Sequence, residues 1–119
     1  MAMKVLVTGA TGYVGGRLVP KLLEQGHTIR VIAREPHRLD GVPWVSSVEI
    51  IQGDLLNPDD VRAAVAGQDV VYYLVHSMSS AGDFEALERQ VATSVASESA
   101  HAGVSRIVYL GGLHPQGPL

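Results

Sequence analysis

Short apolar runs alternate with helical patterns along the whole chain of 119 residues, and this alternation is the strongest constraint on its fold. The first run, Lys4 to Thr8, is continuously apolar in its centre, as in a strand buried on both faces of a parallel sheet. Similar runs follow at residues 28–33, 48–52, 69–75 and 106–110. Because a helical pattern or a loop separates each pair, we expect parallel strands joined by right-handed crossovers.

The segments between the runs have the patterns of helices and of one irregular loop. Apolar residues repeat at helical spacing over about residues 13–25 and 82–102. Asn57, directly before Pro58, predicts the start of a further helix. Residues 34–47 contain the single tryptophan and predict a loop with one helical turn. The expected fold is α/β, a Rossmann-like doubly wound parallel sheet with strand order 3-2-1-4-5, truncated after the fifth strand.

Composition and charge narrow the classes of function. The absence of cysteine excludes disulfide scaffolds, thiolate zinc sites and cysteine nucleophiles. A net charge of -3 with 5% aromatic residues argues against a nucleic-acid partner. No stretch approaches the roughly 20 apolar residues of a membrane span, and no spacing of His, Asp and Glu suggests a metal site. We expect a cytoplasmic protein, because the first strand follows the N-terminus without a signal-peptide pattern.

Glycines stand at regular intervals between the first strand and the first helix. Gly9 can make the tight turn out of the strand, and Gly12 allows the backbone to approach a pyrophosphate. Gly15 allows close packing of the helix, whose N-terminus offers free amide groups to phosphates. The spacing G-x-x-G-x-x-G in this context predicts a dinucleotide site, whereas the alternative is a tight turn that binds nothing.

The segment TGATGYVGGRLVPKLLEQGH resembles the opening of extended and atypical short-chain dehydrogenases/reductases. The later segments GDLLNPDDVRAAVAGQDVVYYLVHSM and GVSRIVYLGGL resemble their NmrA-like, NAD(P)H-binding branch. The resemblance implies that residues 1–119 are the N-terminal part of an NAD(P)-binding Rossmann domain, without the substrate-binding part. It also implies these cofactor-binding residues: Gly9, Thr11, Gly12, Tyr13, Val14 and Gly15 at the pyrophosphate, Asp54 and Leu55 at the adenine, and Val75, His76 and Ser77 along the ribose near the nicotinamide.

The choice between NADP(H) and NAD(H) depends on the residues after the second strand. An arginine there pairs with a 2′-phosphate, and an acid there holds the ribose hydroxyls. Arg34 stands at this position, and Arg38 can close a clamp of two guanidinium groups. We therefore expect NADP(H) to be preferred, with NAD(H) possible if Glu35 turns inward to the ribose. The alternative is that both arginines are solvated loop charges.

The Tyr-x-x-x-Lys pair that the resemblance implies for catalysis is absent from this chain, so its catalytic residues are unknown. Lysine occurs only at positions 4 and 21, and Gly111-Gly112 stands where the family has its serine. The expected explanations are a chain cut before the sixth strand or a branch that lacks the pair. His76 and His114 follow the fourth and fifth strands and can donate a proton, although loop histidines bonded to backbone are the plainer interpretation.

The sequence thus leaves several functional hypotheses open. The first is the NAD(P)H-binding domain of a short-chain-type oxidoreductase or epimerase that acts on an unknown small molecule. The alternative is a redox sensor or regulatory module that binds NADP(H) without catalysis. A weaker third hypothesis, an S-adenosylmethionine-dependent methyltransferase, leaves Arg34 without a phosphate to bind. The fifth strand would also expose an apolar sheet edge, which predicts self-association.

Overall fold

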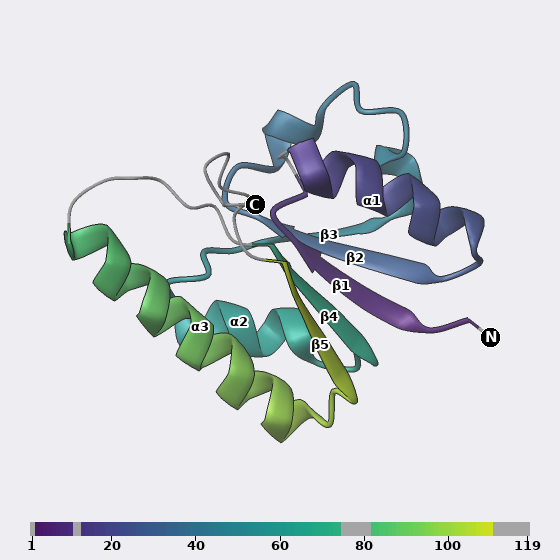
Figure 1. Ribbon diagram of the computed structural model, residues 1–119. Helices are drawn as coiled ribbons and strands as arrows, with labels where there is room; N and C mark the ends of the chain where they lie inside the picture. The colour runs from purple at the N-terminus through teal and green to yellow at the C-terminus, as the bar shows by residue number, and fades with distance from the viewer. Residues whose placement is uncertain (1, 11–12, 75–81, 111–119) are drawn as a thin grey trace, which may run out of the picture.

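The computed structural model describes residues 2–10, 13–74 and 82–110 and contains a parallel five-stranded sheet with the order β3-β2-β1-β4-β5 (Figure 1). The strands are β1 (Lys4–Thr8), β2 (Thr28–Ala33), β3 (Glu49–Gln52), β4 (Val70–Leu74) and β5 (Arg106–Leu110). The α-helices are α1 (Tyr13–Glu24), α2 (Pro58–Val65) and α3 (Gly82–Ala102). The predicted fold class and strand order are confirmed. Strand ends differ from the prediction by one residue at most, and the helices α1 and α3 by one residue at most.

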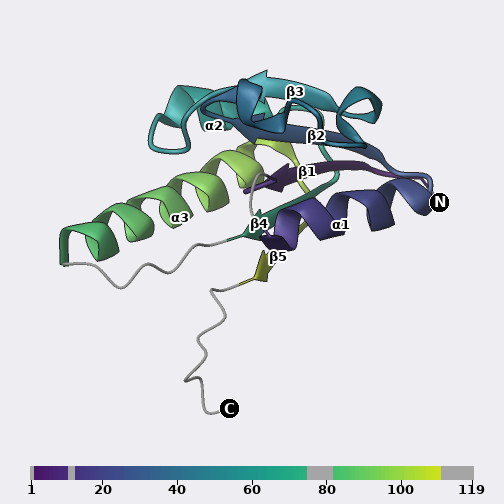
Figure 2. The ribbon, with the colours of Figure 1, turned by 90° about the horizontal axis from the view of Figure 1, so that it is seen from above.

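Helices cover both faces of the sheet. Helix α1 lies on one face, and α2 and α3 lie side by side on the other (Figures 1 and 2). Each face has its own apolar core, because successive strand side chains point to opposite sides. Val5 and Val7 pack with the α1 side, and Leu6 packs with the α2 and α3 side. No helix in the described ranges is long and apolar enough to span a bilayer.

Burial differs between the central strands and the edge strands. In β1 every residue after Lys4 is buried, as the continuous apolar run predicts. The edge strand β3 has no buried residue, and in β5 Tyr109 is 60% exposed. The expectation of strands buried on both faces therefore holds for the centre of the sheet and is wrong for its edges. Each edge strand has a neighbouring strand on one side only.

The link between β2 and β3 is the main departure from the expected pattern. In place of one helical turn it forms two short 3-10 turns, η1 (Pro36–Leu39) and η2 (Val45–Ser47). Leu39 and Trp44, which are 1% and 8% exposed, belong to the same core as α1. This link therefore covers part of the α1 face without an α-helix of its own.

The predicted start of α2 at Asn57 is confirmed, and α1 ends in a glycine turn. The Asn57 side chain accepts a hydrogen bond from the Asp59 amide at 2.9 Å and thereby caps α2. Gly26, the second residue after α1, has a φ of +88°, and the His27 amide donates to the Leu22 carbonyl at 3.2 Å. This is the backbone pattern of a Schellman motif, which requires a left-handed residue after the helix. These ends direct α1 and α2 back to the next strands of the sheet.

Candidate dinucleotide-binding site

The strand order places a topological switch point between β1 and β4, where ligands bind in open α/β sheets. Backbone pairing between these strands runs from Val5↔Val70 to Val7↔Tyr72. Beyond the last pair, the Thr8 hydroxyl donates to the Tyr72 carbonyl at 3.4 Å and accepts from the Leu74 amide at 3.1 Å. The buried Thr8 side chain thus joins the strands where the backbone pairing stops. Sequence reasoning missed this residue, because it ends an ordinary apolar run.

The turn after β1 is built on glycine. Gly9 has a φ of +72°, which residues with a Cβ rarely adopt, and a Cβ there would lie 3.3 Å from the Leu74 Cβ. A Cβ on Gly15 would lie 2.3 Å from the Gly9 carbonyl oxygen. The first turn of α1 therefore rests on the backbone of the turn that precedes it. The predicted geometric roles of Gly9 and Gly15 match this packing, while Thr11 and Gly12 lie outside the described residues.

Helix α1 begins at Tyr13, at the carboxyl end of β1, and has no acidic residue in its first turn. Its free amide groups and the positive end of its dipole are therefore not offset by a carboxylate of the same turn. The Val14 side chain is 40% exposed at this end of the helix. Such a helix start can bind the phosphates of a dinucleotide.

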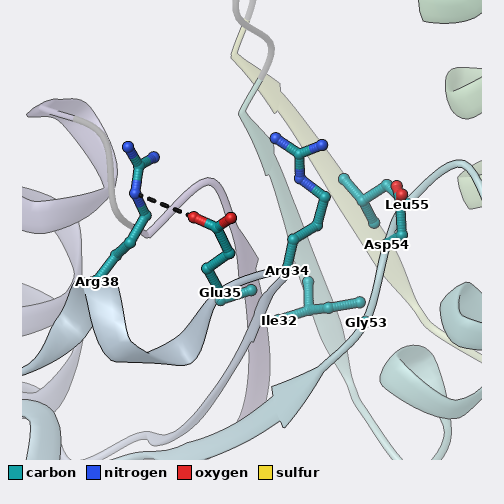
Figure 3. Close-up of a pocket in the computed structure, with 8 residues that line it drawn as sticks. Ile32, Arg34, Glu35, Arg38, Gly53, Asp54 and Leu55 are labelled. Atoms are coloured by element: carbon teal, nitrogen blue, oxygen red, sulfur yellow. Dashed lines mark ion pairs between the residues drawn. The ribbon is translucent and has the colours of Figure 1, made fainter.

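A cavity of about 180 Å³ lies at the carboxyl ends of β2 and β3. Its lining comes from the end of β2, from the segment after it and from the loop after β3, as Figure 3 shows: Ile32, Ala33, Arg34, Glu35, Arg38, Gly53, Asp54 and Leu55. The cavity thus brings together four of the predicted residues, Arg34, Arg38, Asp54 and Leu55, from two separate segments.

Three charged groups of this cavity, those of Arg34, Glu35 and Arg38, come from the short segment after β2. Arg34 is exposed directly after β2, and its guanidinium has no hydrogen-bond or ion-pair partner among the described residues. The Arg38 Nε lies 3.5 Å from the Glu35 Oε1, and both side chains are more than half exposed. Figure 3 shows the head groups of Arg34, Glu35 and Arg38 projecting to the same side. Since an exposed ion pair contributes little free energy, a ligand can compete for Arg38 at small cost.

The loop after β3 is ordered by its own hydrogen bonds. The Asp54 Oδ1 accepts from the Leu56 amide at 2.9 Å, and the Asp54 amide donates to the Asp60 Oδ2 at 2.8 Å. A Cβ on Gly53 would lie 3.1 Å from the Asp60 Cβ and from the Ile32 Cδ1. Gly53 therefore lets this loop pass close to α2 and β2. It was not among the predicted site residues, although it opens the GDL segment that carries the resemblance.

Several predicted residues lie outside the described ranges. These are Val75, His76 and Ser77 after β4, and His114 beyond β5. Burial, together with the neighbouring Tyr109, raises the pKa of Tyr73 to about 12, so its phenol is protonated at neutral pH and is a weak acid. Its ring contacts that of Tyr109 in a tilted arrangement, with centroids 5.5 Å apart and an angle of 49° between the ring planes. Both explanations for the missing Tyr-x-x-x-Lys pair, a chain cut before the sixth strand and a branch without the pair, stay predictions.

Comparisons with known proteins give the same assignment as the geometry. The model of the NAD(P)H-binding family matches residues 9–117. The chain is 38% identical over 116 residues to a 3-beta-hydroxysteroid dehydrogenase of Mycolicibacterium neoaurum, covering 89% of this chain and 31% of that protein. It thus spans about a third of that relative's length.

Solved structures extend the likeness to the fold. The Citrobacter sp. triphenylmethane reductase complexed with NADP(H) has a TM-score of 0.73 and 25% identity, and the match covers 89% of this chain and 36% of that one. A short-chain dehydrogenase/reductase superfamily protein from Agrobacterium tumefaciens with bound NAD has a TM-score of 0.68 and 27% identity, over 89% and 31% of the two chains. Solved structures with NADP(H) and with NAD bound therefore share the fold of this chain.

These matches decide between the open hypotheses. The family match excludes the methyltransferase interpretation, and relatives named as dehydrogenases and reductases do not favour the regulatory module. The chain belongs to the NAD(P)H-binding family, as an NAD(P)H-binding Rossmann domain of the atypical short-chain dehydrogenase/reductase type.

Proposed function

We propose that this chain is the cofactor-binding domain of an oxidoreductase that uses NADP(H) in preference to NAD(H). The bound nicotinamide would accept or supply the hydride. The residues of this chain would hold and orient the dinucleotide, and the substrate would be a small molecule bound largely by other parts of the protein. Relatives named as a steroid dehydrogenase and a dye reductase support the reaction class, without identifying this substrate.

The observation that carries the NADP(H) preference is the cavity that Arg34 and Arg38 line. Arg34 offers a guanidinium without a protein partner among the described residues, and Glu35 is engaged with Arg38. An incoming 2′-phosphate can pair with Arg34 and draw Arg38 away from Glu35, because guanidinium binds phosphate through two parallel hydrogen bonds. Glu35 would have to leave Arg38 in order to hold the ribose of NAD(H).

The remaining contacts follow from the same edge of the sheet. The backbone from Gly9 to Gly15, including Thr11, Gly12, Tyr13 and Val14, would bind the pyrophosphate at the start of α1. The Asp54 Oδ1 already accepts from the Leu56 amide, so Oδ2 is the oxygen left to accept from the adenine amino group. Leu55 would pack against the adenine ring. Residues Val75 to Ser77 would run along the nicotinamide ribose.

The preference is tested by titrating NADPH and NADH fluorescence with purified protein. Arg34→Ala removes hydrogen bonds to a charged group, so NADPH binding should weaken by about 10- to 100-fold while NADH binding changes little. Arg89→Ala on α3 removes the same charge far along the chain from the cavity and serves as the control. An Arg34→Ala protein that keeps the wild-type ratio of NADPH to NADH affinity would refute the preference.

Self-association through β5 is a further part of this proposal. Within the described residues, β5 pairs with β4 alone, and Ile107 and Tyr109 are 37% and 60% exposed. An open strand edge with apolar side chains can pair with a second copy. Sedimentation of the purified protein tests this directly.

A further inference from the structure

A proline inside α1 frees a backbone acceptor that faces the link between β2 and β3. Pro20 lies within the helix and has no amide hydrogen. The carbonyl four residues earlier, that of Gly16, therefore lacks its helical donor. The Trp44 Nε1 donates to this Gly16 oxygen at 3.3 Å. The indole thus takes the place of the missing amide, across 28 positions of sequence.

The same tryptophan is a core anchor. Trp44 is 8% exposed and belongs to the apolar cluster that includes Val19 and Leu22 of α1. Leu39, which is 1% exposed, is the second anchor of the link. Both ends of the stretch between Leu39 and Trp44 are therefore fastened to the face of the sheet that α1 covers.

Consecutive hydrogen-bonded turns connect the buried residues Leu39 and Trp44 to the residues that line the cavity. The Arg38 amide donates to the Glu35 carbonyl at 2.9 Å, and the Asp40 amide donates to the His37 carbonyl at 3.0 Å. The Val42 amide then donates to the Leu39 carbonyl at 3.0 Å. Consecutive turns of this kind leave the backbone few alternatives. Arg38 stands directly before the buried Leu39, so its backbone position depends on the anchors that follow it.

We propose that Trp44 is a positioning residue for cofactor discrimination. Its hydrogen bond to the Gly16 carbonyl holds the link between β2 and β3 against α1, so that Arg38 stays at the cavity. This inference rests on the proposed preference for NADP(H). Trp44 itself lines no part of the cavity. Its loss should therefore lower the affinity for the 2′-phosphate and leave the contacts shared by both dinucleotides intact.

The test combines Trp44→Phe, which removes the donor and keeps an aromatic ring, with Arg38→Ala. Trp44→Phe should weaken NADPH binding about fivefold, the equivalent of one hydrogen bond, and NADH binding by less than about twofold. In the Arg38→Ala background the same substitution should cost little more, because its effect passes through Arg38. Equal weakening of NADPH and NADH by Trp44→Phe, or full additivity with Arg38→Ala, would overturn the inference.

A second variant tests the hydrogen bond itself, even if Trp44→Phe fails to fold. Pro20→Ala gives the Gly16 carbonyl a helical amide, which competes with the indole. Because Trp44 is the single tryptophan, its indole N–H gives one resonance in a nitrogen–proton spectrum. In Pro20→Ala this proton should exchange faster with solvent and the ratio of NADPH to NADH affinity should fall. An unchanged exchange rate would overturn the assigned bond.

Arg34→Ala in the same titrations separates the two proposals. If Arg34→Ala lowers the NADPH to NADH ratio and Trp44→Phe does not, the positioning role alone is wrong. If neither variant moves the ratio, the preference for NADP(H) is wrong and the positioning role falls with it.

Discussion

Two adjacent glycines in α1 provide a matched pair for testing the turn at the proposed pyrophosphate site. Gly15→Ala would place a Cβ 2.3 Å from the Gly9 carbonyl oxygen and 2.8 Å from the Ala10 Cα. Gly16→Ala would place its Cβ 3.9 Å from the Ala10 oxygen, an ordinary contact. Both positions are helical, so the substitutions differ in their surroundings and little else.

The size of the difference follows from the geometry. An ordinary C···O contact is about 3.3 Å or longer, so the backbone at Gly9 must move by about 1 Å to admit the Gly15→Ala methyl group. Overpacking of this kind costs about 1–3 kcal/mol, and a backbone obstacle places the cost towards the upper end. Both variants gain about 0.5–1 kcal/mol from replacing a helical glycine. This gain cancels in the comparison, so Gly15→Ala should be less stable than Gly16→Ala by about 1–3 kcal/mol.

Urea unfolding measures the stability difference, and fluorescence titration measures its effect on the site. A displaced turn should weaken NADPH and NADH alike, by about tenfold, because both carry the same pyrophosphate. Gly16→Ala should bind both dinucleotides as the wild type does. If Gly15→Ala is as stable as Gly16→Ala and binds NADPH normally, the close contact between α1 and the Gly9 turn does not exist in solution.

Further predictions concern the core and the sheet edge. The Arg30 Nη1 donates to the Ala64 and Ala66 carbonyls at the end of α2, at 3.0 and 2.8 Å. Arg30→Met should therefore lower the free energy of unfolding, measured by urea denaturation, by about 1.5–3 kcal/mol. A loss under about 0.5 kcal/mol would show that these hydrogen bonds do not stabilise the end of α2. The pKa of Tyr73 is raised from 10.0 to about 12, so the folded state binds more protons across that window and stability should fall as pH rises through it. Tyr73→Phe should remove the part of the decline in the free energy of unfolding that comes from this phenol. If the variant and the wild type show identical pH profiles of stability, the raised pKa of Tyr73 is wrong. Ile107→Lys, which places a charge on the β5 edge, should reduce any self-association seen by sedimentation, and unchanged association would point to another surface.

Much of the fold was predictable because its signals are local. Continuous apolar runs separated by crossovers predict a parallel sheet, and the order 3-2-1-4-5 is that of the doubly wound fold. The Asn57 cap and the Gly26 turn each depend on a few neighbouring residues. The glycine turn after β1 was predictable for the same reason. Arg34 was expected at the site from its place directly after the second strand, and Asp54 was expected there from the family resemblance.

The features that were not predicted depend on contacts distant in sequence. The bond from Trp44 to the Gly16 carbonyl joins residues 28 positions apart, and the bond from Arg30 to Ala64 joins residues 34 positions apart. Pro20 removes an amide hydrogen from within α1, and its consequence becomes visible only when the partner of the freed Gly16 carbonyl is known. The exposure of β3 was not expected, since its apolar run resembles those of central strands, whereas the exposed edge at β5 was expected.

A crystal structure of the protein with NADP⁺ is the most direct measurement of the central claim. We expect the pyrophosphate against the backbone between Gly9 and Gly15, and the 2′-phosphate in the cavity between Arg34 and Arg38. A dinucleotide that lies away from the start of α1, or whose 2′-phosphate touches neither arginine, would mean that this edge of the sheet binds its cofactor in another way or does not bind it.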